Sequence, residues 1–169
     1  MQNIILFGEM GSGKSTVAKY ICNKYGYTRF SLGEKIHLEC KLHGNENREE
    51  LQEYGQMMRK VFGEFIWCDY VINKSKGIDK IIIDDGRQLN EYSYFTNLKY
   101  IPIAVIADKN LRLKRLSNRV NYKINLNTFE HDTEKQARKV VEMCNIKIYN
   151  NYFIDKLYDQ IDEIMKGIN

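Results

Sequence analysis

A glycine-rich segment near the start of the chain contains the residue types that hold phosphate groups. Residues 8–15 read Gly-Glu-Met-Gly-Ser-Gly-Lys-Ser and match the pattern G-x-x-x-x-G-K-[ST]. Glycines let successive backbone N–H groups turn toward phosphate oxygens, and the start of a following helix adds partial positive charge at the same place. The pattern therefore predicts a site for the phosphates of a nucleoside triphosphate. The residues expected to line it are Gly8, Gly11, Ser12, Gly13, Lys14, Ser15 and Thr16.

Two residues of this segment suit the charges of a nucleotide bound with Mg²⁺. Lys14 is expected to reach the β- and γ-phosphates, and the Ser15 hydroxyl is expected to hold the metal. A second segment, residues 80–86, contains three isoleucines followed by Asp84 and Asp85, which predicts a buried strand ending in carboxylates. Asp84 follows the apolar run directly and is the predicted magnesium residue, with Asp85 as the alternative.

Positive charge is concentrated in one stretch of the chain. Residues 109–123 carry six basic residues and no acidic one, although the net charge of the whole chain is only +4. A polyphosphate substrate is one explanation. The other is a solvated helix face whose opposite side, with Leu111, Leu113 and Leu116, packs into the core.

Length and composition favour one globular domain. The chain has 169 residues, of which 43% are hydrophobic and 28% charged. No apolar run approaches the ~18 residues that span a bilayer, and the start of the chain lacks the basic region of a signal peptide, so we expect a cytoplasmic protein without membrane contact. The four cysteines contain no C-x-x-C pair and the three histidines no metal-ligand spacing, so neither a disulfide framework nor a zinc site is expected.

Strands and helices are predicted to alternate along the chain. Apolar runs predict strands at 3–7, 27–31, 80–86, 101–108 and 145–149. Helical periodicity predicts helices from near 14 to 25, at 32–42, as a pair between 48 and 75 broken near Gly63, and at 88–98, 111–119, 133–144 and 154–168. Near-continuous apolar strands separated by helices are typical of a parallel sheet covered on both faces. We therefore expect an α/β three-layer sandwich with a five-stranded parallel sheet, which binds ligands at the carboxyl ends of its strands.

The order of these motifs resembles the nucleoside monophosphate kinases and their relatives, namely adenylate kinase, dephospho-CoA kinase and the phage-type deoxynucleoside monophosphate kinases. "FSLGEKIH" at 30–37 is similar to the start of their acceptor-binding region, and "IIIDDGRQ" at 81–88 to their third strand. "LKRLSNRV" at 113–120 resembles the entry to their lid, and "HDTEKQARKV" at 131–140 the returning lid helix. The resemblance implies one P-loop kinase domain over 1–169, with an acceptor-binding insertion at about 32–77 and a short lid at about 115–135.

The resemblance also implies roles for individual residues. Arg87 would contact the acceptor phosphate, and Arg115, Arg119 and Arg138 would contact the transferring phosphates. Asn150 would lie near the donor base. Residues placed on the acceptor side are Glu34, His37 and Arg59. Adenylate kinases usually carry arginine where His37 stands and Pro-Arg after the Asp-Gly pair where this chain has Arg87 directly, so the identity of the acceptor stays open.

Three functions are weighed from these residues. A GTPase-type switch requires an Asn-Lys-x-Asp motif, but "NKSK" at 73–76 lacks the aspartate and precedes the Asp84 strand. A nucleic-acid-linked ATPase or a regulatory ATP-binding module would show a stronger basic stripe. We therefore expect an ATP- and Mg²⁺-dependent kinase of a nucleoside monophosphate or related nucleotide, monomeric or homodimeric, without nucleic acid as a partner. An alcohol acceptor would also require a carboxylate base, which the sequence does not place.

Overall fold

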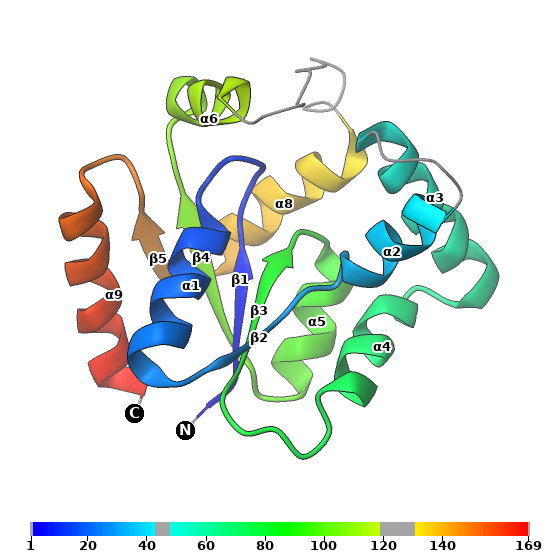
Figure 1. Cartoon of the computed structure of the whole chain (residues 1–169), viewed down its shortest axis with the longest axis horizontal. Coiled ribbons are helices and arrows are strands. Elements are labelled where there is room, and N and C mark those ends of the chain that lie inside the picture. Colours follow the sequence, from blue (N-terminus) through cyan, green and yellow to red (C-terminus); the bar gives the residue numbers. More distant parts are fainter. Residues whose placement is uncertain (1, 43–47, 119–130, 169) are drawn as a thin grey trace.

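Five strands form one parallel sheet in the described part of the chain, which comprises residues 2–42, 48–118 and 131–168 of this computed structural model (Figure 1). Their order across the sheet is β2-β3-β1-β4-β5, and each neighbouring pair runs parallel. The strands are β1 (Ile4–Phe7), β2 (Thr28–Phe30), β3 (Ile81–Gly86), β4 (Ile101–Ile106) and β5 (Ile146–Tyr149). The predicted five-stranded parallel sheet is confirmed.

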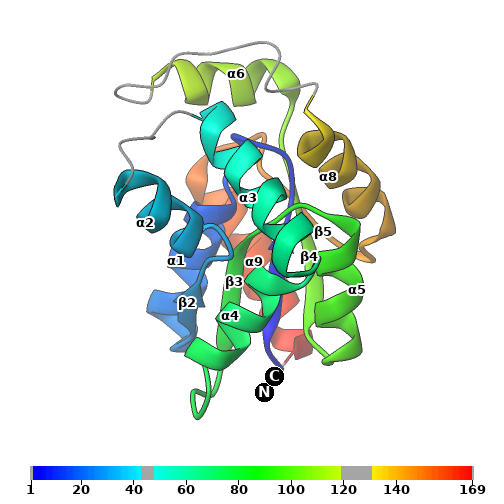
Figure 2. The same cartoon turned by 90° about the vertical axis from the view of Figure 1, so that its right-hand side faces the viewer.

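Helices pack on both faces of this sheet, so the predicted three-layer α/β architecture is also confirmed (Figures 1 and 2). One face is covered by α1 (Lys14–Tyr25) and α9 (Ile154–Ile168). The other is covered by α4 (Ile66–Lys74), α5 (Leu89–Asn97) and α8 (Asp132–Met143). The remaining described helices are α2 (Glu34–Leu42), α3 (Arg48–Phe62) and α6 (Lys109–Ser117).

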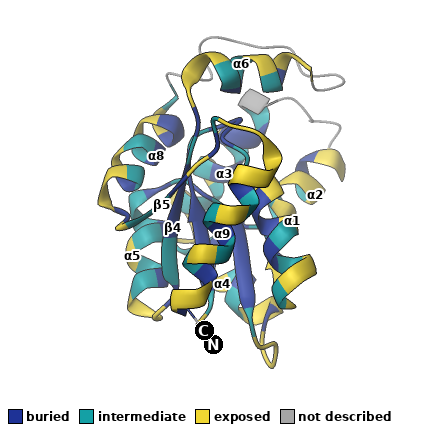
Figure 3. Cartoon of the chain, turned by 90° about the vertical axis from the view of Figure 1, so that its left-hand side faces the viewer, coloured by how far each residue is buried: buried dark blue, intermediate teal, exposed yellow. Residues whose placement is uncertain are grey.

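The sheet is the most buried layer of the molecule (Figure 3). All four residues of β1 have no exposed surface. A parallel strand between two helical layers loses solvent on both faces, and this is why the strands are near-continuous apolar runs rather than alternating ones.

The side chains of β3 alternate between the two faces of the sheet. Ile82 packs with α1 and α9, whereas Ile81 and Ile83 pack with α4 and α5. Because successive side chains of a strand point to opposite faces, Asp84 is directed toward α1 and Asp85 toward the other face. The two acids that end β3 therefore lie in different surroundings.

Two glycines end helices where the sequence predicted breaks. Gly26 follows α1 with a φ of 73°, and Gly63 follows α3 with a φ of 104°. Both angles lie in the left-handed region, which glycine adopts without strain. The predicted pair of helices between 48 and 75 is thus confirmed, and α2, α3 and α4 all lie on the side of the molecule that faces the viewer in Figure 2.

No helix in the described ranges is long and apolar enough to cross a membrane. The four cysteines are free thiols. Burial raises the pKa of Cys40, and it raises the pKa of Cys144 to about 12, so these two thiols stay protonated at neutral pH.

Candidate active site

The segment from Gly8 to Ser15, here called the phosphate loop, joins β1 to the first turn of α1. Gly13 has a φ of 99°. A β-carbon on Gly13 would lie 2.1 Å from Asn150 Nδ2, and a β-carbon on Gly8 would lie 2.4 Å from the carbonyl oxygen of Val105. Both distances are far below van der Waals contact. The Gly8 contact is with backbone, so the loop packs closely on β4 only because this position is glycine. At Gly13 the Asn150 side chain would have to shift, and the positive φ favours glycine.

Asn150 and Arg115 contact the backbone of the phosphate loop. Asn150 Nδ2 donates a hydrogen bond to the Ser12 carbonyl oxygen at 2.9 Å. Arg115 Nη2 donates to the Asn150 carbonyl oxygen at 2.9 Å, and its Nη1 lies 3.5 Å from the carbonyl oxygens of Gly11 and Ser12. Arg115 was expected at the transferring phosphates, and the structure places it against loop carbonyls and the turn after β5. Burial lowers the pKa of Arg115.

Lys14 is buried at the start of α1. Its Nζ donates hydrogen bonds to the carbonyl oxygens of Gly8 and Glu9, the latter at 3.2 Å. Burial, together with the neighbouring Arg87 guanidinium, lowers the pKa of Lys14 to about 7. Its ammonium is therefore destabilised in the ligand-free protein, and an incoming anion would favour the charged form.

Asp84 faces the first turn of α1 and is only 1% exposed. Burial, followed by the adjacent Asp85 carboxylate, raises the pKa of Asp84, whereas Arg29 and the Ser15 hydroxyl lower it. Arg29 Nε lies 2.8 Å from Asp84 Oδ2 as an ion pair. A carboxylate has four lone-pair positions, so Asp84 retains capacity for another partner beside Arg29 and Ser15.

Asp85 has a different set of partners from Asp84. Its Oδ2 accepts hydrogen bonds from Ser31 Oγ at 2.7 Å and from the Gly33 amide at 2.8 Å, and its Oδ1 accepts from the Leu32 amide at 2.8 Å. These bonds fix the turn between β2 and α2. The geometry therefore favours Asp84 over Asp85 for a metal beside Ser15.

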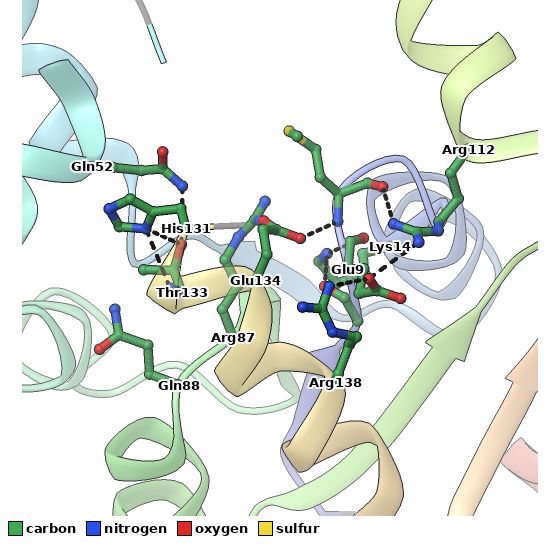
Figure 4. A network of polar contacts seen from close by, with 12 residues as sticks. Glu9, Lys14, Gln52, Arg87, Gln88, Arg112, His131, Thr133, Glu134 and Arg138 are labelled. Carbon is green, nitrogen blue, oxygen red and sulfur yellow. Dashed lines mark hydrogen bonds and ion pairs between the residues drawn. The ribbon is translucent and has the colours of Figure 1, made fainter. Parts of the chain in front are cut away.

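Arg87, in the turn after β3, forms an ion pair with Glu134 of α8 (Figure 4). The second oxygen of Glu134 accepts a hydrogen bond from the Met10 amide of the phosphate loop at 2.9 Å. Glu134 has no exposed surface, and the Arg87 side chain is 19% exposed. The pair thus joins β3, the phosphate loop and α8 at one point.

Two further arginines converge on Glu9 of the phosphate loop (Figure 4). Arg112 Nη2 from α6 lies 3.1 Å from Glu9 Oε1, and Arg138 Nη1 from α8 lies 3.3 Å from the same oxygen. Arg112 is buried and also donates to the Met10 carbonyl oxygen at 3.2 Å. The predicted Arg138 therefore lies at the loop, while the predicted Arg119 lies outside the described residues.

Sequence reasoning did not single out Glu9, Arg112 or Glu134. Arg112 lies within the basic stretch at 109–123, and Glu9 occupies an unconstrained position of the phosphate motif. Glu134 stands four residues before Arg138, a spacing that places both on one helix face. That spacing was the available signal for a charged cluster on α8.

The predicted acceptor-side residues divide between a buried pair and the protein surface. Arg59 Nη2 of α3 lies 2.9 Å from Glu91 Oε1, and both side chains are largely buried. Glu91 also accepts hydrogen bonds from the Arg87 and Gln88 amides, and burial raises the pKa of Glu91. Glu34 pairs with Lys74 at 2.6 Å on the surface. His37 is exposed on α2.

A polar contact links α3 to α8. Gln52 Nε2 of α3 donates a hydrogen bond to Thr133 Oγ1 at 2.9 Å (Figure 4). Gln52 is buried, and its Oε1 has no hydrogen-bond partner among the described residues. His131 precedes α8 and caps it by accepting a hydrogen bond from the Thr133 amide.

Comparison with known proteins gives both sequence relatives and fold relatives. Residues 4–140 match the model of the family described as AAA domain. An adenylate kinase of Pyrococcus furiosus is 30% identical over 126 residues, which span 69% of this chain and 56% of that protein. A UPF0200 protein of Thermoplasma volcanium is 22% identical over 173 residues, or 96% of this chain and 95% of that protein.

Solved structures share the fold over the full chain. Shikimate kinase from Aquifex aeolicus has a TM-score of 0.65 and 19% identity, covering 99% of this chain and 98% of that one. The protein TT1252 from Thermus thermophilus has a TM-score of 0.66 and 16% identity, covering 100% of both chains. At these identities the likeness concerns the fold, which is the α/β fold of P-loop kinases.

Proposed function

We propose that this chain, which belongs to the AAA domain family and is a P-loop protein of the nucleoside monophosphate kinase type, transfers the γ-phosphoryl group of ATP to a nucleoside monophosphate or a related nucleotide. The coarser part of this statement, a phosphotransferase with a P-loop kinase fold, is supported by the family, by the adenylate kinase relative and by the fold. The acceptor is the finer part, and it rests on the residues around the phosphate loop.

The observation that carries the proposal is the convergence of cationic side chains on one loop (Figure 4). Lys14 comes from the loop itself, Arg87 from the turn after β3, Arg112 from α6 and Arg138 from α8. Phosphoryl transfer requires little covalent chemistry from the protein, but it requires positive charge fixed around the moving group. A binding module without chemistry would need the loop but not arginines from three other segments.

Ser15 and Asp84 fit a magnesium ion. Mg²⁺ prefers hard oxygen ligands and keeps several waters, so one carboxylate and one hydroxyl beside substrate phosphates are sufficient. Asp84 is a buried carboxylate that pairs with Arg29 through Oδ2, and it faces the Ser15 hydroxyl. Bound there, the metal would neutralise charge on the donor phosphates.

The residues around the phosphate loop would then bind different phosphate groups according to their positions. The loop amides and Lys14 would bind the donor phosphates, and Thr16, exposed in the first turn of α1, would extend this contact. Arg87 would bind the acceptor phosphate. Arg138 would stabilise charge on the transferring group. A phosphate acceptor is already anionic, so no side chain is assigned as a general base.

A product assay tests this function directly. The protein would be incubated with ATP and Mg²⁺ and with ribo- and deoxyribonucleoside monophosphates, nucleosides, shikimate or dephospho-CoA in turn. We expect a phosphorylated product with a nucleoside monophosphate, its loss in Lys14→Ala, and its retention in Lys19→Ala, because Lys19 is exposed on α1.

Other outcomes would redirect the assignment. ATP binding without transfer to any acceptor would contradict the kinase and favour a regulatory ATP-binding protein. Hydrolysis that rises with added DNA or RNA would favour a nucleic-acid-linked ATPase. Phosphorylation of a nucleoside or of dephospho-CoA alone would keep the phosphotransferase and overturn the nucleotide acceptor.

A further inference from the structure

The buried carboxylate of Glu134, on α8, contacts the phosphate loop, whose backbone amides suit anions. Glu134 has no exposed surface. Its Oε2 accepts the Met10 amide hydrogen of the phosphate loop at 2.9 Å, and its Oε1 pairs with Arg87 (Figure 4). A backbone amide and a guanidinium are also the donors that phosphate oxygens prefer. Glu134 thus uses contacts that a phosphate group could use.

We propose that Glu134 is an internal competitor for substrate phosphate. In the ligand-free protein its carboxylate fills the anion position formed by the Met10 amide and Arg87, and a bound phosphate displaces it. The inference rests on the proposed function, because it takes the phosphate loop and Arg87 as phosphate-binding groups.

Charge balance in the ligand-free protein supports this role. Lys14 and Arg87 lie close enough that the Arg87 guanidinium lowers the pKa of Lys14, while Glu134 counteracts this by raising it. Without an anion, two cations in a largely buried site would repel each other and lack solvation. Glu134 supplies negative charge from within the chain, and Asp85 and Asp84 act on Lys14 in the same direction.

The same charge becomes unfavourable when substrate arrives. A phosphate bound at the loop would place negative charge beside a buried carboxylate, where the local dielectric is low and repulsion is strong. The ligand and Glu134 also need the same donors. Displacement of the carboxylate resolves both conflicts.

Displacement of Glu134 would reach beyond the loop. Glu134 stands in the first turn of α8, beside Thr133, which accepts a hydrogen bond from Gln52 of α3. One turn later, Arg138 contacts Glu9 of the phosphate loop. The first turns of α8 therefore contact the phosphate loop, the turn after β3 and α3. Loss of the Glu134 contacts would leave α8 attached to α3 through Thr133 and to the phosphate loop through Arg138.

The test is calorimetric titration of Glu134→Gln with ADP and with inorganic triphosphate. Because the glutamine is neutral, it removes the competing charge while keeping the side-chain volume. We expect about tenfold tighter binding of both ligands, which corresponds to about 1.4 kcal/mol. Unchanged or weaker binding would overturn the proposal and would indicate that Glu134 stays in place and orients Arg87.

Two further variants make the test specific. Asp132→Asn removes one negative charge from the exposed start of the same helix, and we expect less than a twofold change, which excludes a general effect of net charge. Glu134→Asp keeps the charge but shortens the side chain, so it serves if the glutamine variant does not fold. We expect tighter binding there too, by a smaller factor, and unchanged affinity would count against competition.

This design separates failure of the inference from failure of the proposed function. If the parent protein binds neither ADP nor triphosphate, the assignment of the phosphate loop fails. If the parent binds them and Glu134→Gln binds them equally well, only the competition fails.

Discussion

Arg29 Nε lies 2.8 Å from Asp84 Oδ2, so a guanidinium from the edge strand β2 reaches the carboxylate proposed for Mg²⁺. The Arg29 side chain is 52% exposed, whereas that of Asp84 is 1% exposed. A metal ion at Ser15 and Asp84 would bring a second cation to the same carboxylate. Two cations on one carboxylate repel each other, so Arg29 should limit how tightly the metal binds.

Replacement of Arg29 by glutamine is therefore expected to tighten metal binding about fivefold, since repulsion near the protein surface is worth on the order of 1 kcal/mol. Titration of Mn²⁺ in the presence of ADP, followed by electron paramagnetic resonance, measures this affinity. Lys74→Gln, which breaks a surface pair with Glu34, serves as the control. Equal Mn²⁺ affinity in Arg29→Gln and the parent would show that the two cations do not compete.

Lys14 should make nucleotide binding depend on pH. Its pKa is lowered to about 7 in the ligand-free protein, and phosphate would raise that pKa by favouring the ammonium. Binding above pH 7 must therefore take up a proton, and the affinity for ADP should fall by up to about tenfold per pH unit between the two pKa values. Calorimetry at pH 8 in buffers of different ionisation enthalpy measures the uptake.

We expect the parent protein to take up close to one proton for each ADP bound at pH 8. Lys14→Arg carries a side chain that stays protonated at this pH, so its uptake should be near zero. Equal uptake by the two proteins would assign the titration to another group.

Gly13→Ala is expected to abolish ADP binding. The new β-carbon would lie 2.1 Å from Asn150 Nδ2, and the φ of 99° is unfavourable for alanine, so folding stability should also fall by about 1–3 kcal/mol. Urea unfolding measures the stability and calorimetry the binding. Asn150→Ala removes the clash partner, so the double variant should recover part of the stability but not the part due to φ. Full recovery would show that the backbone angle is not a constraint.

Arg59 is expected to stabilise the fold through Glu91. Both side chains are largely buried at 2.9 Å, so Arg59→Ala leaves a buried carboxylate without its cation and should cost about 3 kcal/mol in the free energy of unfolding. The exposed pair of Lys166 and Glu163 is the comparison, and Lys166→Ala should cost less than about 0.5 kcal/mol. If Arg59→Ala keeps its stability and only raises KM for the acceptor, Arg59 belongs to the substrate site as the sequence predicted.

The element pattern of this protein could be predicted because it follows from local physics. β1 and β3 read as near-continuous apolar runs because both faces of a parallel strand are covered, and Gly26 and Gly63 end helices because of their positive φ. The phosphate loop could be predicted equally well, because phosphate binding requires glycines, a lysine and a hydroxyl at fixed spacing.

The partners of the charged residues could not be predicted in the same way. Arg115 contacts Asn150 and loop carbonyls, and Arg59 pairs with Glu91, and the sequence indicated neither contact. The contacts of Arg115 with phosphates and of Arg59 with substrate stay predictions. A long basic side chain can reach several groups, and which one it meets depends on elements far apart in the chain.

The sequence by itself determined the strands, the helices and the phosphate loop, because periodicity and backbone conformation act over a few residues. Only the tertiary structure decided that Asp84 rather than Asp85 faces Ser15, and that Glu134 lies on the Met10 amide. The first depends on which face of β3 meets α1. The second joins residues 124 positions apart. Such contacts arise from the packing of the layers. A buried charge needs a partner, and the tertiary fold decides which groups are close enough to pair with it.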